Sequence, residues 1–167
     1  MKRIVTSIIL IVGVLTVVGV AYSQQLDKKT QQALMDAIND EYKARATYQK
    51  VIDKFGAIRP FSNIIKAEET HIGELKLLFK KYGIEVPKDE WYNKVPAFAT
   101  QKEACTAGVN AEIDNVKIYD RLLTFVKEQD IVDTFKRLRN ASQDNHLPAF
   151  QRCAGGTGQG QGRGKGK

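Results

Sequence analysis

Glu68 and His71 stand three residues apart in a segment whose apolar residues recur at helical spacing. The apolar positions are Phe61, Ile64, Ile65, Ile72, Leu75, Leu78, Phe79 and Tyr82. Because residues three apart share one face of a helix, the carboxylate and the imidazole should both face the core. A buried, unpaired carboxylate is costly unless it is protonated or meets a positive charge, and a metal ion supplies that charge. Glu-x-x-His on an inward helix face is the ligand pattern of di-metal helical bundles.

A single Glu-x-x-His motif is common by chance, but a longer pattern occurs once in each half of the chain. Each half contains a glutamate, a tyrosine seven residues later, and a histidine 30 or 34 residues after the glutamate. The two sets are Glu41, Tyr48 and His71, and Glu112, Tyr119 and His146. Since unrelated solvated glutamates would not repeat with the same neighbours in the same order, the repeat favours a metal site.

Four helices are expected to carry these residues. They span residues 27–55, 60–82, 100–128 and 131–150. Gly56 suits a helix end and Pro60 a first helical turn, whereas Pro148 should kink or fray the last turn of the fourth helix. Short links make consecutive helices antiparallel, and segment 84–99, which contains two prolines, should cross the bundle from end to end. The expected fold is therefore all-α, with two antiparallel helical hairpins joined by a long crossover.

Glu41 and Glu112 each interrupt an otherwise apolar helical stripe, where an inward ligand would stand. The alternative interpretation is a solvated glutamate at the edge of the stripe, and Glu41 has Arg45 as an available partner one turn further on. Tyr48 and Tyr119 also have two interpretations. They are either candidate catalytic residues that relay electrons or protons, or aromatic residues of the core.

Over residues 30–150 the chain resembles the ferritin-like superfamily. More narrowly, it resembles a bacterial and archaeal ferritin-like family of uncharacterised function whose last helix ends in Asn-His-Leu-x-Ala-Phe, here residues 145–150. The resemblance implies a left-handed four-helix bundle that holds two iron ions. The matching ligands are Glu41, Glu68, His71, Glu112 and His146. Their mixed oxygen and nitrogen donors suit iron or manganese, and zinc is also compatible.

The expected sixth ligand is missing. The position three residues before His146 is Gln143 rather than a glutamate. Asp144 should point about 160° away from His146 in a regular helix, so it cannot replace the missing carboxylate. Glu74, one turn beyond His71, is a spare ligand if the helix shifts. Because three carboxylates leave two divalent ions one charge short of balance, an asymmetric, single-metal or degenerate site is compatible with the sequence.

The first residues are typical of an export signal. Residues 1–23 combine a short basic start, a nearly apolar run over 4–21 and small residues before a cut after Ser23. The alternative is a membrane anchor formed by residues 4–21. Either interpretation places the remainder outside the cytoplasm, in the periplasm or the medium. The remainder divides into a helical domain, 24–153, and a glycine-rich basic tail, 154–167.

The charge of the chain is modestly positive. The formal net charge of +7 falls to +5 when residues 1–23 are removed, because Lys2 and Arg3 are lost and no acid is. The body carries both signs of charge, which argues against a specific nucleic-acid partner. Alternating glycines cannot form a packed element, so the tail is either an inert end or a weak contact to anionic surfaces.

The two cysteines occupy matched positions. Cys105 stands seven residues before Glu112, and Cys153 stands seven residues after His146. On antiparallel helices each thiol would lie about 10.5 Å from the metal level, on the inward face. Since exported proteins keep disulfides, we predict a Cys105–Cys153 bond. The alternative is two small core residues that never bond.

Three functions are compatible with this pattern. The first is a di-iron oxidoreductase that oxidises Fe(II) or reduces oxygen or peroxide. The second is a non-catalytic metal-binding protein, and the third is an interaction module that has lost its metal. The sequence contains no serine nucleophile motif, no Cys-x-x-Cys and no phosphate loop, which argues against nucleophilic catalysis. It does not predict the oligomeric state.

Overall fold

The computed structural model describes residues 25–156, and every regular element within them is helical. The elements are α1 (Lys28–Phe55), α2 (Phe61–Lys81), the 3-10 turn η1 (Trp91–Asn93), α3 (Gln101–Leu122), α4 (Gln129–Ala141), the π-helical turn η2 (Ser142–His146) and α5 (Leu147–Ala154). Since α4, η2 and α5 follow one another without a break, they form one long rod. The all-α prediction is confirmed.

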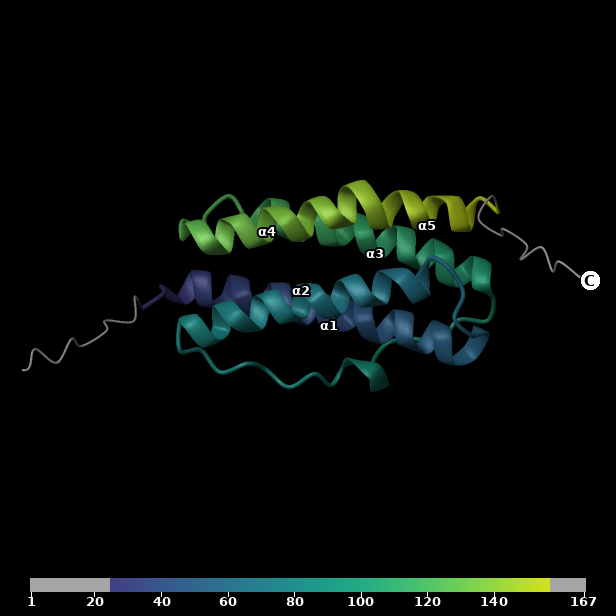
Figure 1. The fold of residues 1–167 in the computed structure, drawn as a ribbon, viewed down its shortest axis with the longest axis horizontal. Coiled ribbons are helices and arrows are strands. Elements are labelled where there is room, and N and C mark those ends of the chain that lie inside the picture. Colours follow the sequence, from purple (N-terminus) through teal and green to yellow (C-terminus); the bar gives the residue numbers. More distant parts are fainter. Residues whose placement is uncertain (1–24, 157–167) are drawn as a thin grey trace, which may run out of the picture.

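The helices form two layers (Figure 1). α1 and α2 pack side by side as one antiparallel hairpin, and α3 packs along the α4–η2–α5 rod as the other. The segment between α2 and α3 runs back along the α1–α2 layer from one end of the molecule to the other. The expected order of hairpin, crossover and hairpin is therefore present in the structure.

Local signals fix the limits of the first hairpin. The Asp27 carboxylate caps α1 by accepting the backbone N–H groups of Lys29 and Thr30, at 2.8 and 2.9 Å. Gly56 follows the last turn with φ of 81°, a conformation that glycine adopts without strain. These two residues explain why the observed α1 differs from the expected helix by a single residue.

Two boundaries in the second hairpin were predicted wrongly. α3 ends at Leu122 rather than residue 128, because the chain tightens there into hydrogen bonds that span three residues, such as Thr124 to Arg121. Val126 then turns inward and is buried at the end of the core. α4 accordingly starts at Gln129, two residues earlier than expected.

The expected fourth helix is interrupted by η2. The Leu147 N–H donates to the Ser142 carbonyl, five residues back, so the chain makes one wide turn before α5. Pro148 explains the position of this turn. A proline has no N–H for the carbonyl four residues back, and its ring crowds that carbonyl. The wide turn relieves this crowding, so the rod continues past Pro148 instead of fraying.

Two apolar clusters fill the interior at different levels along the bundle. One is built around Leu34, Ile38, Leu75, Phe79, Tyr119 and Phe135. The other is built around Tyr48, Phe61, Ile65, Cys105 and Phe150. Between the two clusters lies a layer of buried polar residues, to which α1, α2, α3 and η2 all contribute. This layer carries the candidate site.

None of the helices within residues 25–156 combines the length and apolarity needed to span a bilayer. The expected export signal or anchor at residues 1–23 lies outside the described part of the chain, as does most of the glycine-rich tail.

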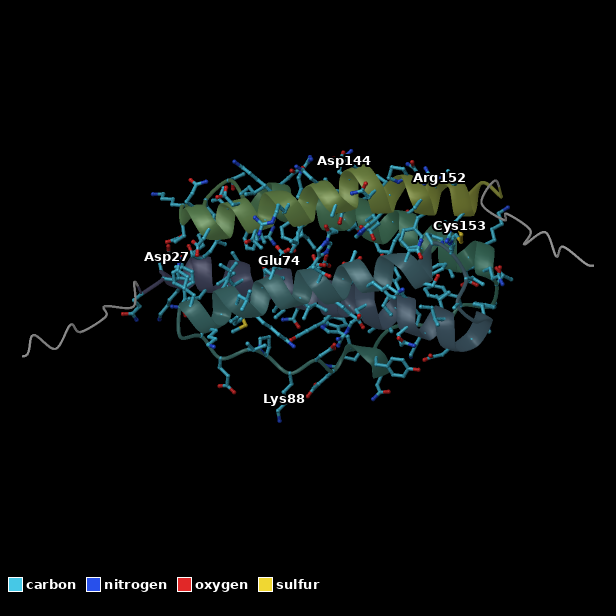
Figure 2. All side chains as sticks on the ribbon, in the orientation of Figure 1. Asp27, Glu74, Lys88, Asp144, Arg152 and Cys153 are labelled. Atoms are coloured by element: carbon cyan, nitrogen blue, oxygen red, sulfur yellow. A yellow bond between two sulfur atoms is a disulfide. The ribbon has the colours of Figure 1, made fainter. Side chains whose placement is uncertain are left out.

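The predicted Cys105–Cys153 disulfide is present, with its two Cα atoms 5.6 Å apart. It joins the first turns of α3 to the last turn of α5 (Figure 2). Cys105 is fully buried and Cys153 is partly exposed. The bond therefore closes the open end of the second hairpin.

Removing this bond should destabilise the protein strongly. In the chain-entropy model, a bond with a sequence separation of 48 stabilises the fold by about 4 kcal/mol. The double variant Cys105→Ala, Cys153→Ala should therefore unfold at a clearly lower urea concentration, with a somewhat steeper dependence on denaturant because its unfolded state is less restricted. Reduction of the wild-type chain should give the same shift. If reduction leaves the unfolding midpoint unchanged, the bond does not stabilise the fold.

Candidate metal centre

Three glutamates and two histidines meet in the polar layer between the apolar clusters. They come from α1, α2, α3 and η2, and none of them is more than 8% exposed. They are Glu41, Glu68, His71, Glu112 and His146. Since these side chains face the interior, the interpretation of Glu41 as a solvated edge residue is wrong. Arg45, which would be the available partner of a solvated Glu41, pairs instead with Asp89 in the crossover.

The five residues form two overlapping triads. One triad is Glu41, Glu68 and His71, and the other is Glu68, Glu112 and His146. Within each triad, one ligand atom from each residue lies within 4.8 Å of the other two. Glu68 belongs to both triads and so occupies the centre of the cluster.

The two oxygens of Glu68 face different histidines. His71 Nδ1 lies 3.1 Å from Glu68 Oε2 and 3.1 Å from Glu41 Oε2. His146 Nδ1 lies 3.3 Å from Glu68 Oε1 and 3.5 Å from Glu112 Oε2. The imidazole rings stack with their centroids 5.7 Å apart. One carboxylate thus stands between two similar histidine–glutamate pairs.

Each tyrosine of the repeat binds the glutamate of the opposite half. The Tyr48 hydroxyl donates to Glu112 Oε1 at 2.5 Å, and the Tyr119 hydroxyl donates to Glu41 Oε1 at 2.6 Å. Burial raises the pKa of both phenols well above its usual value, and the neighbouring carboxylates raise it further. Both hydroxyls therefore remain donors, and each holds one carboxylate oxygen while the Oε2 atom faces a histidine.

The protonation of the cluster follows from its crowded carboxylates. Burial and the charge of Glu68 raise the pKa of Glu41 to about 7. Burial disfavours protonation of the imidazoles, but the nearby carboxylates outweigh it and raise the pKa of His71 to about 10 and that of His146 to about 9. Protons on the two imidazoles thus supply the positive charge that three buried carboxylates need when no metal is bound.

The donor set fits a metal ion better than it fits hydrogen bonding alone. His146 Nδ1 is buried and has no hydrogen-bond partner within residues 25–156. Buried polar atoms are nearly always paired, and this ring nitrogen has only two long ion-pair contacts, 3.3 and 3.5 Å from carboxylate oxygens, so it can accept a further partner. Imidazole nitrogen and carboxylate oxygen together are typical ligands of divalent transition metals. The residues present therefore fit such an ion.

Gln143 does not occupy the sixth position, and that prediction was wrong. Its side chain is exposed, whereas Ser142 is only 2% exposed. The cause is η2: a π-helical turn contains more residues than an α-helical turn, so Ser142 takes the place one turn before His146. The buried residue one turn before His146 therefore carries a hydroxyl and not a carboxylate.

The other acids considered from the sequence lie away from the cluster. Asp144 is exposed and stands on the outer side of the rod (Figure 2). Glu74, the spare ligand, instead accepts a hydrogen bond from Arg137 at 2.9 Å on the surface. Neither residue completes the ligand set.

The sequence interpretation missed Asn115 and Asp40. Asn115 Nδ2 donates to Asp40 Oδ2 at 2.7 Å and lies 3.4 Å from Glu41 Oε1. Asn115 stands three residues after Glu112 and is 6% exposed. That spacing, which matches Glu68 and His71, is the signal that could have identified it.

The family model "Uncharacterized protein domain (DUF2202)" matches residues 30–162. Uncharacterized protein MJ0754 of Methanocaldococcus jannaschii is 26% identical over 144 residues, or 77% of each chain. The crystal structure of hypothetical protein MJ0754 from Methanococcus jannaschii superimposes with a TM-score of 0.72 at 24% identity, over 81% of this chain and 85% of that one. This likeness indicates a shared fold, and the family match extends over most of the chain. The chain therefore belongs to the DUF2202 family.

Proposed function

We propose that this DUF2202 protein is a ferritin-like metal protein whose buried cluster holds two divalent ions, with iron as the physiological metal. The ligands would be Glu41 and His71 for one ion, Glu112 and His146 for the other, and Glu68 for both. The observation that carries the proposal is the position of Glu68, whose two oxygens face two separate histidine–glutamate pairs. Manganese and zinc suit the same donors and are the alternatives.

The proposed activity is oxidation of Fe(II) or reduction of oxygen or peroxide. Bound iron would supply one-electron redox chemistry. The chain contributes the position of the carboxylates, because Tyr48 and Tyr119 each hold one oxygen of a ligand. It also limits the access of bulk water, since all five ligands are buried. The two tyrosines are the residues best placed to pass a proton or an electron to the site.

A non-catalytic metal-binding protein is the second candidate. It is favoured by Ser142, which offers a neutral hydroxyl where a sixth carboxylate would complete the charge balance. A site with five ligands and one uncompensated charge would hold its second ion weakly.

Metal analysis of the anaerobically purified chain tests these candidates. Two irons per chain, followed by oxygen- or peroxide-driven oxidation over many turnovers, would support the oxidoreductase. Bound metal without turnover would favour the non-catalytic role. A chain that binds no iron, manganese or zinc after anaerobic loading would contradict both.

We also propose that the mature chain lies outside the cytoplasm. The disulfide supports this proposal, because such bonds persist in oxidising compartments. Cell fractionation followed by mass determination would test it. An uncleaved chain recovered from the cytoplasm would contradict it.

Metal affinity should rise with pH. At pH 7 the imidazoles of His71 and His146 are protonated in the metal-free protein, since their pKa values are about 10 and about 9. Metal ligation requires neutral imidazoles and an ionised Glu41, so at pH 7 binding should release about one proton per histidine and about half a proton from Glu41. The affinity of each ion should then rise about tenfold per pH unit between pH 7 and 9. Titrations in buffers of different ionisation enthalpy measure the released protons directly.

The stability of the metal-free chain should change in the opposite direction. His71 and His146 have higher pKa values in the folded chain than the value of 6.5 expected in the unfolded chain. Their protonation therefore stabilises the fold fully below pH 6.5, and this stabilisation is lost as the pH rises through 9 and 10. The metal-free chain should therefore become less stable from about pH 6.5 upward. A metal affinity that does not depend on pH would mean that the histidines are neutral before metal binds.

A further inference from the structure

A narrow recess leads from the surface to the metal centre between α1 and α3. Its volume is about 60 Å³, and its walls include Glu68 and Glu112. Lys43 and Asp114 are exposed at its outer part, whereas the two glutamates are buried. The recess therefore connects solvent to two of the proposed ligands.

Asn115 and Asp40 form a polar pair on the wall of this recess. Asn115 Nδ2 donates to Asp40 Oδ2, which leaves the amide oxygen of Asn115 for another partner. That oxygen is buried and has no hydrogen-bond partner within residues 25–156. A buried carbonyl oxygen without a donor is costly, so a group that it can bind is expected there.

The chemistry of the recess selects a cation. Four acidic side chains and one lysine contribute to its walls. An amide oxygen beside a carboxylate suits a hard or borderline divalent ion and not an anion. The recess is small, at about 60 Å³, so a partly dehydrated ion fits and a bulky organic chelate does not.

We propose that this recess is the entry route for free divalent cations, with Asp40 and the Asn115 carbonyl as an intermediate binding site on the way to Glu68 and Glu112. The proposal rests on the proposed function, because it supplies ions to that metal centre. It also specifies the substrate class. The centre takes up aquo-cations one at a time and does not accept a metal that is still held by a chelator.

Loading kinetics of the metal-free full chain test this route. Co(II) is mixed with the protein in a stopped-flow instrument, and its visible absorption reports binding. Asp40→Asn should slow loading about tenfold, because a charge in a narrow recess raises the local cation concentration. Release to excess chelator should slow by a similar factor, so the dissociation constant and final stoichiometry should stay close to wild type. The slowing should shrink at high salt.

Asp36→Asn is the matched control. Asp36 lies one turn earlier on α1 and pairs with Arg121 of α3 at 3.1 Å, outside the recess. The substitution makes the same charge change and should leave the loading rate near wild type. Ala111→Leu narrows the recess without changing its charge, and it should also slow loading and release together.

The outcomes separate this proposal from the one on which it rests. If the wild-type chain takes up no Co(II), the proposed function fails and the entry route fails with it. Normal uptake with unchanged rates in Asp40→Asn and Ala111→Leu overturns the route alone. Faster release without slower loading also overturns it, because Asp40 would then support the bound ion and not its passage.

Discussion

Glu68→Gln should strongly weaken the binding of both metal ions, whereas Glu69→Gln should leave binding unchanged. Glu68 places one oxygen against each histidine, so the amide removes the shared negative charge from both half-sites at once. We expect each affinity to fall by more than about 100-fold, since even outer partners of metal ligands contribute 10- to 100-fold. Glu69 is its exposed sequence neighbour and controls for the change in net charge.

Anaerobic titration against a chelator of known affinity measures this effect, and elemental analysis gives the stoichiometry. Circular dichroism at the same pH shows whether the variant is folded. If Glu68→Gln retains one ion at wild-type affinity, Glu68 is a terminal ligand and does not bridge. If both substitutions weaken binding equally, the effect is one of overall charge.

Ser142→Glu should strengthen binding of the second ion, and Gln143→Glu should not. Ser142 is buried one turn before His146, so a longer acid there would add a fourth carboxylate and balance two divalent ions. We expect the weaker site to gain about tenfold in affinity, or about 1.4 kcal/mol. Without metal, the extra buried carboxylate should lower the stability of the variant.

Thermal unfolding with and without Mn(II) would reveal this pattern. The unfolding temperature of Ser142→Glu should lie below that of wild type without metal and respond more strongly to added Mn(II). Because the side chain of Gln143 is exposed, Gln143→Glu should behave like wild type in both conditions. A gain in Gln143→Glu instead would mean that the rod is regularly α-helical around residue 143.

The disulfide and the sixth ligand position show what can be predicted by counting residues along a helix. Both predictions counted residues from His146 along the same rod. The count toward Cys153 succeeded because α5 is regular, and the count toward Gln143 failed because η2 lies on that side of His146. Pro148 predicts some disturbance of the helix, but a kink, a frayed end and a wide turn all relieve the crowding around a proline. The sequence alone does not choose among them.

The five candidate ligands could be selected from sequence because each is a polar residue on an apolar stripe, and all but Glu68 belong to a pattern that recurs in both halves. The hydrogen-bond partners of these ligands could not be selected in this way. The crossed bonds of Tyr48 and Tyr119 depend on how closely α1 and α3 pack, and each bond joins residues more than 60 positions apart. The contact between Asn115 and Asp40 has the same origin, since it joins α3 to α1 over 75 positions.

These crossed bonds mean that neither hairpin contains a finished half-site. Glu41 lies in the first hairpin and the phenol that holds it lies in the second, while Glu112 and Tyr48 have the reverse arrangement. The disulfide lies wholly within the second hairpin, so it does not link the two. A chain cut within the crossover would thus yield two fragments held together by non-covalent contacts alone, and this shared centre is one of them. Bound metal would then stabilise the association of the two complementary fragments. Metal uptake would therefore serve as a measure of how far the fragments have reassembled.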